Sequence, residues 1–160
     1  MRQRPEGIRW SMPAAASAIE FTRRRVVAQL LFWGVYLDQD TAGTLELLVS
    51  ELTTNAVEHS GAQRFEIGVA VREGEVFVAV ADASPDLPVL RNAGGDEESG
   101  RGMFLVDLLS TAWGVAQRPV GKEVWLTLRL PARPAPVVQA PTRPDSEAIG
   151  HLRPYAHQAG

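Results

Sequence analysis

The sequence predicts an α/β (α+β) two-layer sandwich, in which helices cover one face of a mixed, mostly antiparallel sheet. Two observations predict this fold class. The spacing of apolar residues changes several times between the helical and the strand period. Two pairs of predicted strands are also joined by short glycine-containing turns, as in antiparallel hairpins. The expected order of elements is β-α-α-β-β-loop-α-β-β.

A short strand and two helices are expected first. Residues 8–12 (IRWSM) alternate between apolar and polar side chains and predict an edge strand. Residues 15–33 carry apolar side chains at helical spacing. A second helix should begin near Asp40 or Thr41, both acceptable N-caps, and run to about residue 60.

Two hairpins and a third helix are expected in the second half. Strands are predicted at residues 64–71 and 76–82, which are rich in β-branched side chains. Residues 83–99 contain proline, glycine and acidic residues without a period, and they predict a loop. Residues 100–110 return to helical spacing, and residues 111–130 predict the second hairpin.

Composition divides the 160 residues into two parts. Residues 8–130 fit a single domain of ordinary size, and 45% of the whole chain is hydrophobic, which allows a sizeable core. Residues 131–160 hold six of the eleven prolines and one aromatic residue. Such a segment buries too little apolar surface to offset its ordering entropy, so it is expected to be a flexible, proline-rich tail.

Charge and cysteine content exclude several classes of function. The net charge of −3 argues against binding to nucleic acid driven by bulk charge, and the cluster Arg23, Arg24 and Arg25 is interpreted as a solvated helix face. The absence of cysteine excludes disulfides, Cys-ligated zinc and thiol catalysis. No apolar run approaches the roughly 20 residues of a membrane span, and the N-terminus does not resemble a signal peptide. We therefore expect a cytoplasmic protein.

Glu51, Asn55 and His59 form a polar stripe on the second predicted helix. Their spacing of four residues places them along one edge of the apolar arc, beside Leu48 and Leu52. Half-buried polar groups need partners, which a ligand or ion at the edge of the sheet would supply. The alternative is an ordinary polar flank, in which Glu51 pairs with a base, Asn55 bonds to a carbonyl and His59 meets the helix C-terminus.

Two later stretches carry groups suited to a nucleotide. Residues 80–88 (VADASPDLP) end a strand with Asp82, whose carboxylate could accept a hydrogen bond from an amine such as that of adenine. An Asp that starts a turn is the alternative. Gly100 and Gly102 stand at the start of the third helix, where backbone N–H groups can approach an anion. Glycine used for helix capping is the alternative there.

Taken together and in this order, the stretches resemble the GHKL (Bergerat-fold) ATPase superfamily, in particular its single-domain anti-sigma-factor serine kinases. Residues 51–60 (ELTTNAVEHS) resemble the N box, Glu-x-x-x-Asn-Ala-x-x-His. Residues 80–88 resemble the first glycine box and residues 100–115 (GRGMFLVDLLSTAWGV) the second. Residues 121–128 (GKEVWLTL) resemble the closing strand. The similarity covers residues 8–130 and leaves the tail outside.

The resemblance implies a role for each polar residue of the motifs. Asn55 would bind Mg²⁺ through its side-chain oxygen, and Glu51 would orient or deprotonate the attacking water or serine hydroxyl. Asp82 would hold the adenine amine. Many superfamily members have Asp-x-Gly-x-Gly in the first box, whereas this chain has DASPD. Ser84 can still offer a hydroxyl or a backbone N–H there, in a loop with less conformational freedom.

Further contacts are implied along the second glycine box and the last strand. Gly100, Arg101 and Gly102 would surround the phosphates, and Met103 would line the adenine pocket, with Val106 beside it. Both Met103 and Val106 have core packing as their default role. Thr127, which points opposite to Leu126 and Leu128, could touch the base or a bridging water. We expect a structural role for His59 and a solvated turn for Lys122.

Several functions are compatible with these residues. The first is a protein serine/threonine kinase that uses ATP and Mg²⁺, phosphorylates an anti-anti-sigma (STAS-like) partner and binds a sigma factor. The second is a module that binds ATP and changes its affinity for a partner without transfer. A sensor histidine-kinase ATPase domain is disfavoured, because no helix pair with an acceptor histidine precedes residue 15. A catalytically silent domain is the remaining alternative. Relatives often pair through this domain, so a homodimer is also expected.

Overall fold

The computed structural model describes residues 7–59, 61–86 and 101–138, and the predicted order of elements is confirmed there. The elements are β1 (Ile8–Pro13), α1 (Ala16–Phe32), α2 (Gln39–His59), β2 (Arg64–Arg72), β3 (Glu75–Asp82), α3 (Arg101–Leu109), β4 (Ala112–Gln117) and β5 (Lys122–Arg129). Most of the loop predicted at residues 83–99, and Gly100 after it, lie outside the described residues.

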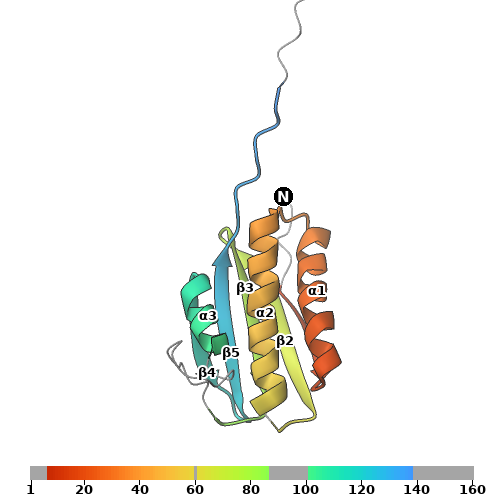
Figure 1. Ribbon diagram of the computed structural model, residues 1–160, viewed down its shortest axis with the longest axis vertical. Coiled ribbons are helices and arrows are strands. Elements are labelled where there is room, and N and C mark those ends of the chain that lie inside the picture. Colours follow the sequence, from red (N-terminus) through yellow and green to blue (C-terminus); the bar gives the residue numbers. More distant parts are fainter. Residues whose placement is uncertain (1–6, 60, 87–100, 139–160) are drawn as a thin grey trace, which may run out of the picture.

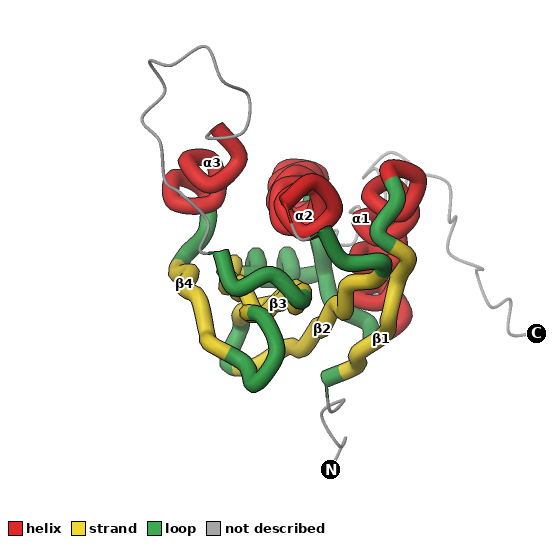
Figure 2. Tube along the Cα trace, turned by 90° about the horizontal axis from the view of Figure 1, so that it is seen from below, coloured by secondary structure: helices red, strands yellow, loops and turns green. Residues whose placement is uncertain are grey.

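The five strands form one sheet in the order β1-β2-β3-β5-β4, and every neighbouring pair is antiparallel. The strand β1 pairs only with β2 and is an edge strand, as predicted. Figure 2 shows the three helices on one face of this sheet. The predicted two-layer sandwich is therefore confirmed: the helices cover one face of the sheet, and no helix of the described ranges lies on the other.

The helix α2 is the central element of the helical layer. It lies between α1 and α3 and crosses over β3 (Figure 1), and it packs against all three of these elements. Its inward side chains are fully buried, and the same core includes the inward rows of β2, β3 and β5. Because α2 is held on both flanks, the polar stripe beside its buried face is positioned by the core and not by a loop.

The start of α2 differs from the prediction. The helix begins at Gln39, and the capping residue is Asp38, whose Oδ1 accepts a hydrogen bond of 2.8 Å from the backbone N–H of Thr41. Asp40 and Thr41 were the predicted caps, and both lie inside the first turn instead. An Asp, a Gln and a second Asp precede Thr41, so composition alone favours none of the neighbouring residues as the cap.

Replacing Asp38 by alanine should lower the melting temperature by a few degrees, because an amide at the first turn of α2 loses its acceptor. Bonds from Thr41 lower the pKa of Asp38. The capping contribution is therefore complete above the ordinary pKa of the carboxyl group and is lost as pH falls through the lowered value. Thermal melts of Asp38→Ala and Asp40→Ala from pH 3 to pH 7 test this prediction. Equal loss in both variants would contradict it.

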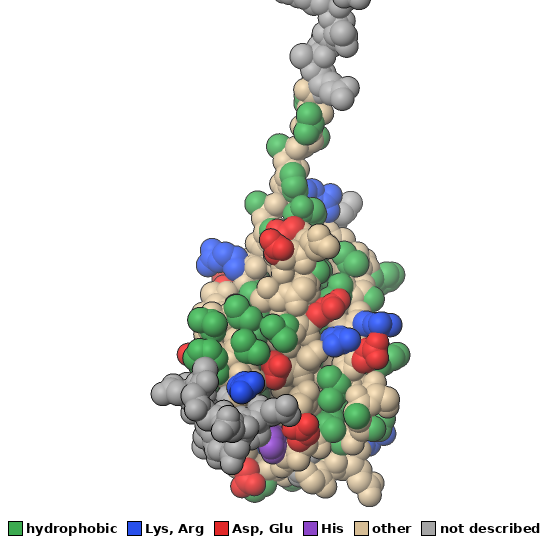
Figure 3. All heavy atoms as spheres, in the orientation of Figure 1, with side chains coloured by type: hydrophobic (Ala, Val, Ile, Leu, Met, Phe, Trp, Pro, Cys, Tyr) green, Lys and Arg blue, Asp and Glu red, His purple; other side chains and the backbone are tan. Residues whose placement is uncertain are grey.

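The arginine cluster on α1 does not act as one surface. Arg24 forms an ion pair of 2.7 Å with Glu20, and the guanidinium of Arg25 lies 4.4 Å from the centre of the Trp10 ring. Figure 3 shows acidic and basic side chains interspersed over the coloured part of the helix-covered face. No helix in the described ranges is long and apolar enough to cross a membrane.

Candidate nucleotide site

The polar stripe of α2 faces α3 across a small cleft. The helices α2 and α3 pack side by side. The cleft between them has a volume of about 40 Å³ and is lined by Glu51, Thr54, Asn55, Glu58, His59, Gly102 and Met103. All three members of the predicted stripe therefore lie together with Gly102 of the predicted phosphate loop and with Met103, although about fifty residues separate the two groups in the sequence.

Gly102 leaves the space in which the Glu51 carboxylate lies. A Cβ atom at this position would overlap Oε2 of Glu51, so only glycine lets the carboxylate lie against the first turn of α3. The backbone N–H groups of a first helical turn have no acceptor within the helix. The site therefore combines a carboxylate with the backbone N–H groups at the positive end of a helix, which also favours an anion.

Glu51 is half-buried, and its environment disfavours the charged form. Burial raises the pKa of this carboxyl group above its ordinary value of 4.5, and the nearby charge of Glu58 raises it further. A carboxylate whose proton affinity is increased is a better base. The position and the electrostatics of Glu51 both fit a group that accepts a proton.

We expect Gly102→Ala to move the Glu51 carboxylate outward and to return its pKa toward the ordinary value, because the new methyl group takes the carboxylate's place. An NMR titration of the side-chain carboxyl groups measures this change. The matched control is Gly43→Ala in α2, where a Cβ atom meets nothing within 4 Å. An unchanged Glu51 titration in Gly102→Ala would contradict the contact.

Asp82 ends β3 as a buried carboxylate with one free oxygen. Its Oδ1 accepts hydrogen bonds from the backbone N–H of Ser84 at 2.8 Å and from Nζ of Lys122 at 3.1 Å. Its Oδ2 is buried and has no donor among the described residues. Buried polar atoms are almost always hydrogen-bonded. An unsatisfied acceptor at this position fits a donor supplied by a ligand, such as an exocyclic amine.

Lys122 was predicted in a solvated turn, and this prediction is wrong. The residue is 1% exposed and is the first residue of β5. The register pairs it with Asp82, and it continues the inward row of Val124, Leu126 and Leu128. The turn itself occupies residues 118–121. The alternation of apolar residues along β5 predicts an inward position for Lys122. The charge of the side chain led to the opposite assignment.

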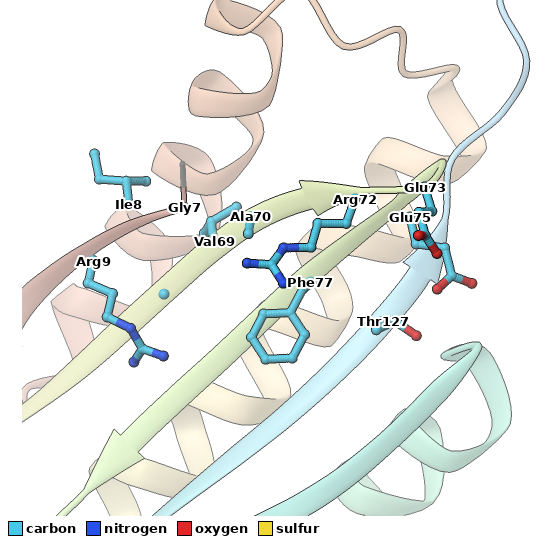
Figure 4. Close-up of a pocket in the computed structure, with 11 residues that line it drawn as sticks. Gly7, Ile8, Arg9, Val69, Ala70, Arg72, Glu73, Glu75, Phe77 and Thr127 are labelled. Atoms are coloured by element: carbon cyan, nitrogen blue, oxygen red, sulfur yellow. The ribbon is translucent and has the colours of Figure 1, made fainter. Parts of the chain in front are cut away.

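Thr127 is not brought to the other predicted residues. Its neighbours Leu126 and Leu128 are buried under the helices, so Thr127 points to the opposite face of the sheet. It lines a separate cavity of about 540 Å³ there, together with residues that include Phe77 and Arg72 (Figure 4). The helices, Glu51 and Asn55 lie across the sheet, so the predicted contact of Thr127 with the base is not supported.

The other predicted residues have mixed positions. Arg101 is exposed at the start of α3, at the same helix end as Gly102. Met103 is buried in the core and also lines the cleft, whereas Val106 belongs to the core alone. Ser84 is buried, and its Oγ accepts a hydrogen bond of 3.2 Å from the backbone N–H of Asp86.

The donor set fits a magnesium ion that arrives with a nucleotide. The described residues contain no group of three or more His, Cys, Asp or Glu side chains that could hold a metal. One carboxylate and one carboxamide, Glu51 and Asn55, lie together in the cleft. Mg²⁺ is usually held by one or two protein oxygens together with phosphate oxygens and water, so this pair is sufficient only when phosphates complete the shell.

The chain belongs to the family of histidine kinase-like ATPase domains, since the profile of that family matches residues 12–128. The predicted resemblance to GHKL-type ATPases is confirmed, and a family of ATPase domains implies the use of ATP. The uncharacterised protein SCO4941 of Streptomyces coelicolor is 33% identical over 100 residues, which is 54% of this chain and 95% of that protein.

A solved structure supports the same fold. The RsbU and RsbW domains of Rv1364c from Mycobacterium tuberculosis match with a TM-score of 0.61 and 21% identity. The match covers 82% of this chain and 34% of that chain, so the present chain spans about a third of that protein. At this identity the likeness shows the fold alone.

Proposed function

We propose that this protein is an ATP- and Mg²⁺-dependent serine/threonine kinase of the anti-sigma-factor type. Its acceptor would be a serine or threonine of an anti-anti-sigma (STAS-like) partner, and it would also bind a sigma factor. The observation that carries the proposal is the contact of Glu51 with Gly102, in which a carboxylate lies against the N-terminus of α3. Such a carboxylate is suited to act as a general base, and the helix N-terminus is suited to phosphate. Membership in the family of histidine kinase-like ATPase domains supports the use of ATP, and the choice of partners follows from the resemblance of the motifs to anti-sigma-factor serine kinases.

Each group of the site has a part in the proposed reaction. Asp82 would bind the amine of the base with its free Oδ2, and the first turn of α3 would hold the phosphates. Asn55 would bind Mg²⁺, which neutralises phosphate charge when present. Glu51 would accept the proton of the attacking hydroxyl. Phosphoryl transfer requires mainly positioning and charge neutralisation, and these four parts supply both.

The experiment is a transfer assay with γ-labelled ATP, Mg²⁺ and a candidate STAS-like protein. We expect label on a serine or threonine of the partner, no transfer without Mg²⁺, and no transfer to a partner whose acceptor residue is alanine. ATP binding with no transfer to any candidate partner would reject the kinase. Absence of ATP binding would reject nucleotide use altogether.

An ATP-dependent binding module is the second candidate, and one observation favours it. Among the described residues, the lining of the cleft contains Glu51, Glu58 and His59 but no Lys or Arg. Transfer therefore depends on Mg²⁺ and on Arg101 for neutralisation of the phosphate charge. In this case ATP would change the affinity for a sigma factor without labelling any partner, and pull-down measurements with and without ATP would detect that change.

A further inference from the structure

We propose that Lys122 determines which purine the site accepts. It holds Oδ1 of Asp82 and leaves Oδ2 as the free acceptor, so that a base with an exocyclic amine binds and a base with a carbonyl group in the same position is rejected. This inference rests on the proposed nucleotide site and assigns a specificity role within it to a residue that lies in no sequence motif for phosphate or metal.

The pair formed by Lys122 and Asp82 is buried. The two side chains are 2% and 1% exposed, and Nζ lies 3.1 Å from Oδ1. A buried charge is costly unless an opposite charge compensates it, so each side chain requires the other. The register of β3 and β5 pairs Asp82 with Lys122, so the sheet itself holds the two buried side chains together.

The carboxylate is held in one orientation. Lys122 and the backbone N–H of Ser84 both donate to Oδ1, which leaves Oδ2 without a described donor. The turn before Lys122 also packs on the backbone of Asp82 and Ala83. A Cβ atom at Gly121, whose φ is +78°, would overlap the carbonyl oxygen of Asp82. Rotation or displacement of Asp82 would therefore disturb both the ion pair and this turn.

Charge and geometry together produce selectivity. A carboxylate paired with an ammonium group can only accept hydrogen bonds, so a ligand atom that meets Oδ2 must be a donor. An amine at position 6 of a purine satisfies Oδ2. A carbonyl oxygen at that position would place two acceptors together and leave both unsatisfied. Adenine carries the amine, whereas hypoxanthine carries the carbonyl group.

The test compares the affinities of ATP and inosine triphosphate (ITP) for the full chain in the presence of Mg²⁺, by calorimetric titration. We expect the wild type to prefer ATP by about 10- to 100-fold, since a carbonyl group at this position would leave buried acceptors unsatisfied. Lys122→Met should reduce the ATP/ITP ratio at least about tenfold, because it removes the ammonium group that pairs with the carboxylate and fixes Oδ2 as the acceptor. The ratio within one variant does not depend on that variant's stability.

Two further variants decide the outcome if Lys122→Met does not fold. Lys122→Gln keeps a donor without the charge and should also reduce the ratio. The double variant Asp82→Asn with Lys122→Met removes both charges, and its carboxamide can donate to a carbonyl group, so the ATP preference should disappear. Arg129→Met is the control, because it removes an exposed cation from the same strand. Its guanidinium group lies 3.8 Å from the Glu75 carboxylate, and its loss should leave the ATP/ITP ratio unchanged.

An unchanged ratio in both Lys122→Gln and Lys122→Met, or equal binding of ATP and ITP by the wild type, would overturn the role of Lys122 and leave the nucleotide site intact. Failure of the wild type to bind either nucleotide would instead reject the proposed function, and this inference with it. The two failures are therefore distinguishable in one set of titrations.

Discussion

Replacing Glu51 by glutamine is expected to reduce phosphoryl transfer by a factor of about 10² to 10⁴, the usual contribution of a positioned general base, while ATP binding stays close to that of the wild type. Glutamine has the same shape but cannot accept the proton. It can still lie against Gly102, because that contact depends on size. Single-turnover transfer of labelled phosphate and a separate ATP titration measure the two quantities.

The matched control is Glu58→Gln. Glu58 lines the same cleft and is the second cause of the raised Glu51 pKa, so this variant should keep transfer and lower the Glu51 pKa slightly. Full transfer in Glu51→Gln would remove Glu51 from the chemistry. An equal loss of ATP binding and transfer would assign it a structural role.

The raised pKa of Glu51 has opposite consequences for activity and stability. Transfer requires the ionised form, so its rate should fall as pH decreases through a value above 4.5. Stability changes in the other direction: a carboxyl group whose folded pKa is raised contributes most below its unfolded pKa, and this contribution is lost as pH rises through the folded value. Glu51→Gln should therefore unfold at a slightly higher temperature than the wild type at pH 7 and lose this advantage in acid.

The fold was predictable because, in most elements, the spacing of apolar residues in the sequence matches the face that the element buries in the core. The alternation of β2 and β3 places one row in the core, and the apolar arc of α2 faces the sheet. Glu51, Asn55 and Gly102 were also found from the sequence, since helical spacing and the position of a glycine at a helix start are local properties. The structure adds that these residues face one another.

The errors concern properties that depend on strand register. Lys122 was assigned to solvent from its charge, although its parity with Leu126 places it inward. Thr127 was assigned to the nucleotide, although the same parity places it on the face without helices. The partner of Lys122 could not be predicted, because Asp82 lies forty residues away and the register of β3 and β5 joins them. Parity along β5 would have placed Lys122 inward. For Thr127 the parity was read correctly, and what the sequence left open was which face of the sheet carries the helices and Glu51.

Replacing Asn55 by alanine should remove the dependence of ATP binding on Mg²⁺. Asn55 is the one carboxamide among the described residues that line the cleft between α2 and α3, and oxygen donors are what Mg²⁺ requires. Loss of a contact to a charged group should weaken ATP binding in Mg²⁺ by about 10- to 100-fold. ATP titrations in Mg²⁺ and in a chelator, for the wild type and the variant, measure this: the two curves of the variant should coincide.

Thr54→Ala is the matched control, since Thr54 precedes Asn55 on α2 and lines the same cleft. This variant should keep the wild-type difference between ATP affinity in Mg²⁺ and ATP affinity in chelator, because Thr54 does not belong to the polar stripe of Glu51, Asn55 and His59. A Mg²⁺ effect that survives in Asn55→Ala would show that the ion is held by other groups. Glu51 is the carboxylate of the same polar stripe and lies in the same cleft. Combining Asn55→Ala with Glu51→Gln would then show whether Glu51 binds the metal in addition to accepting the proton.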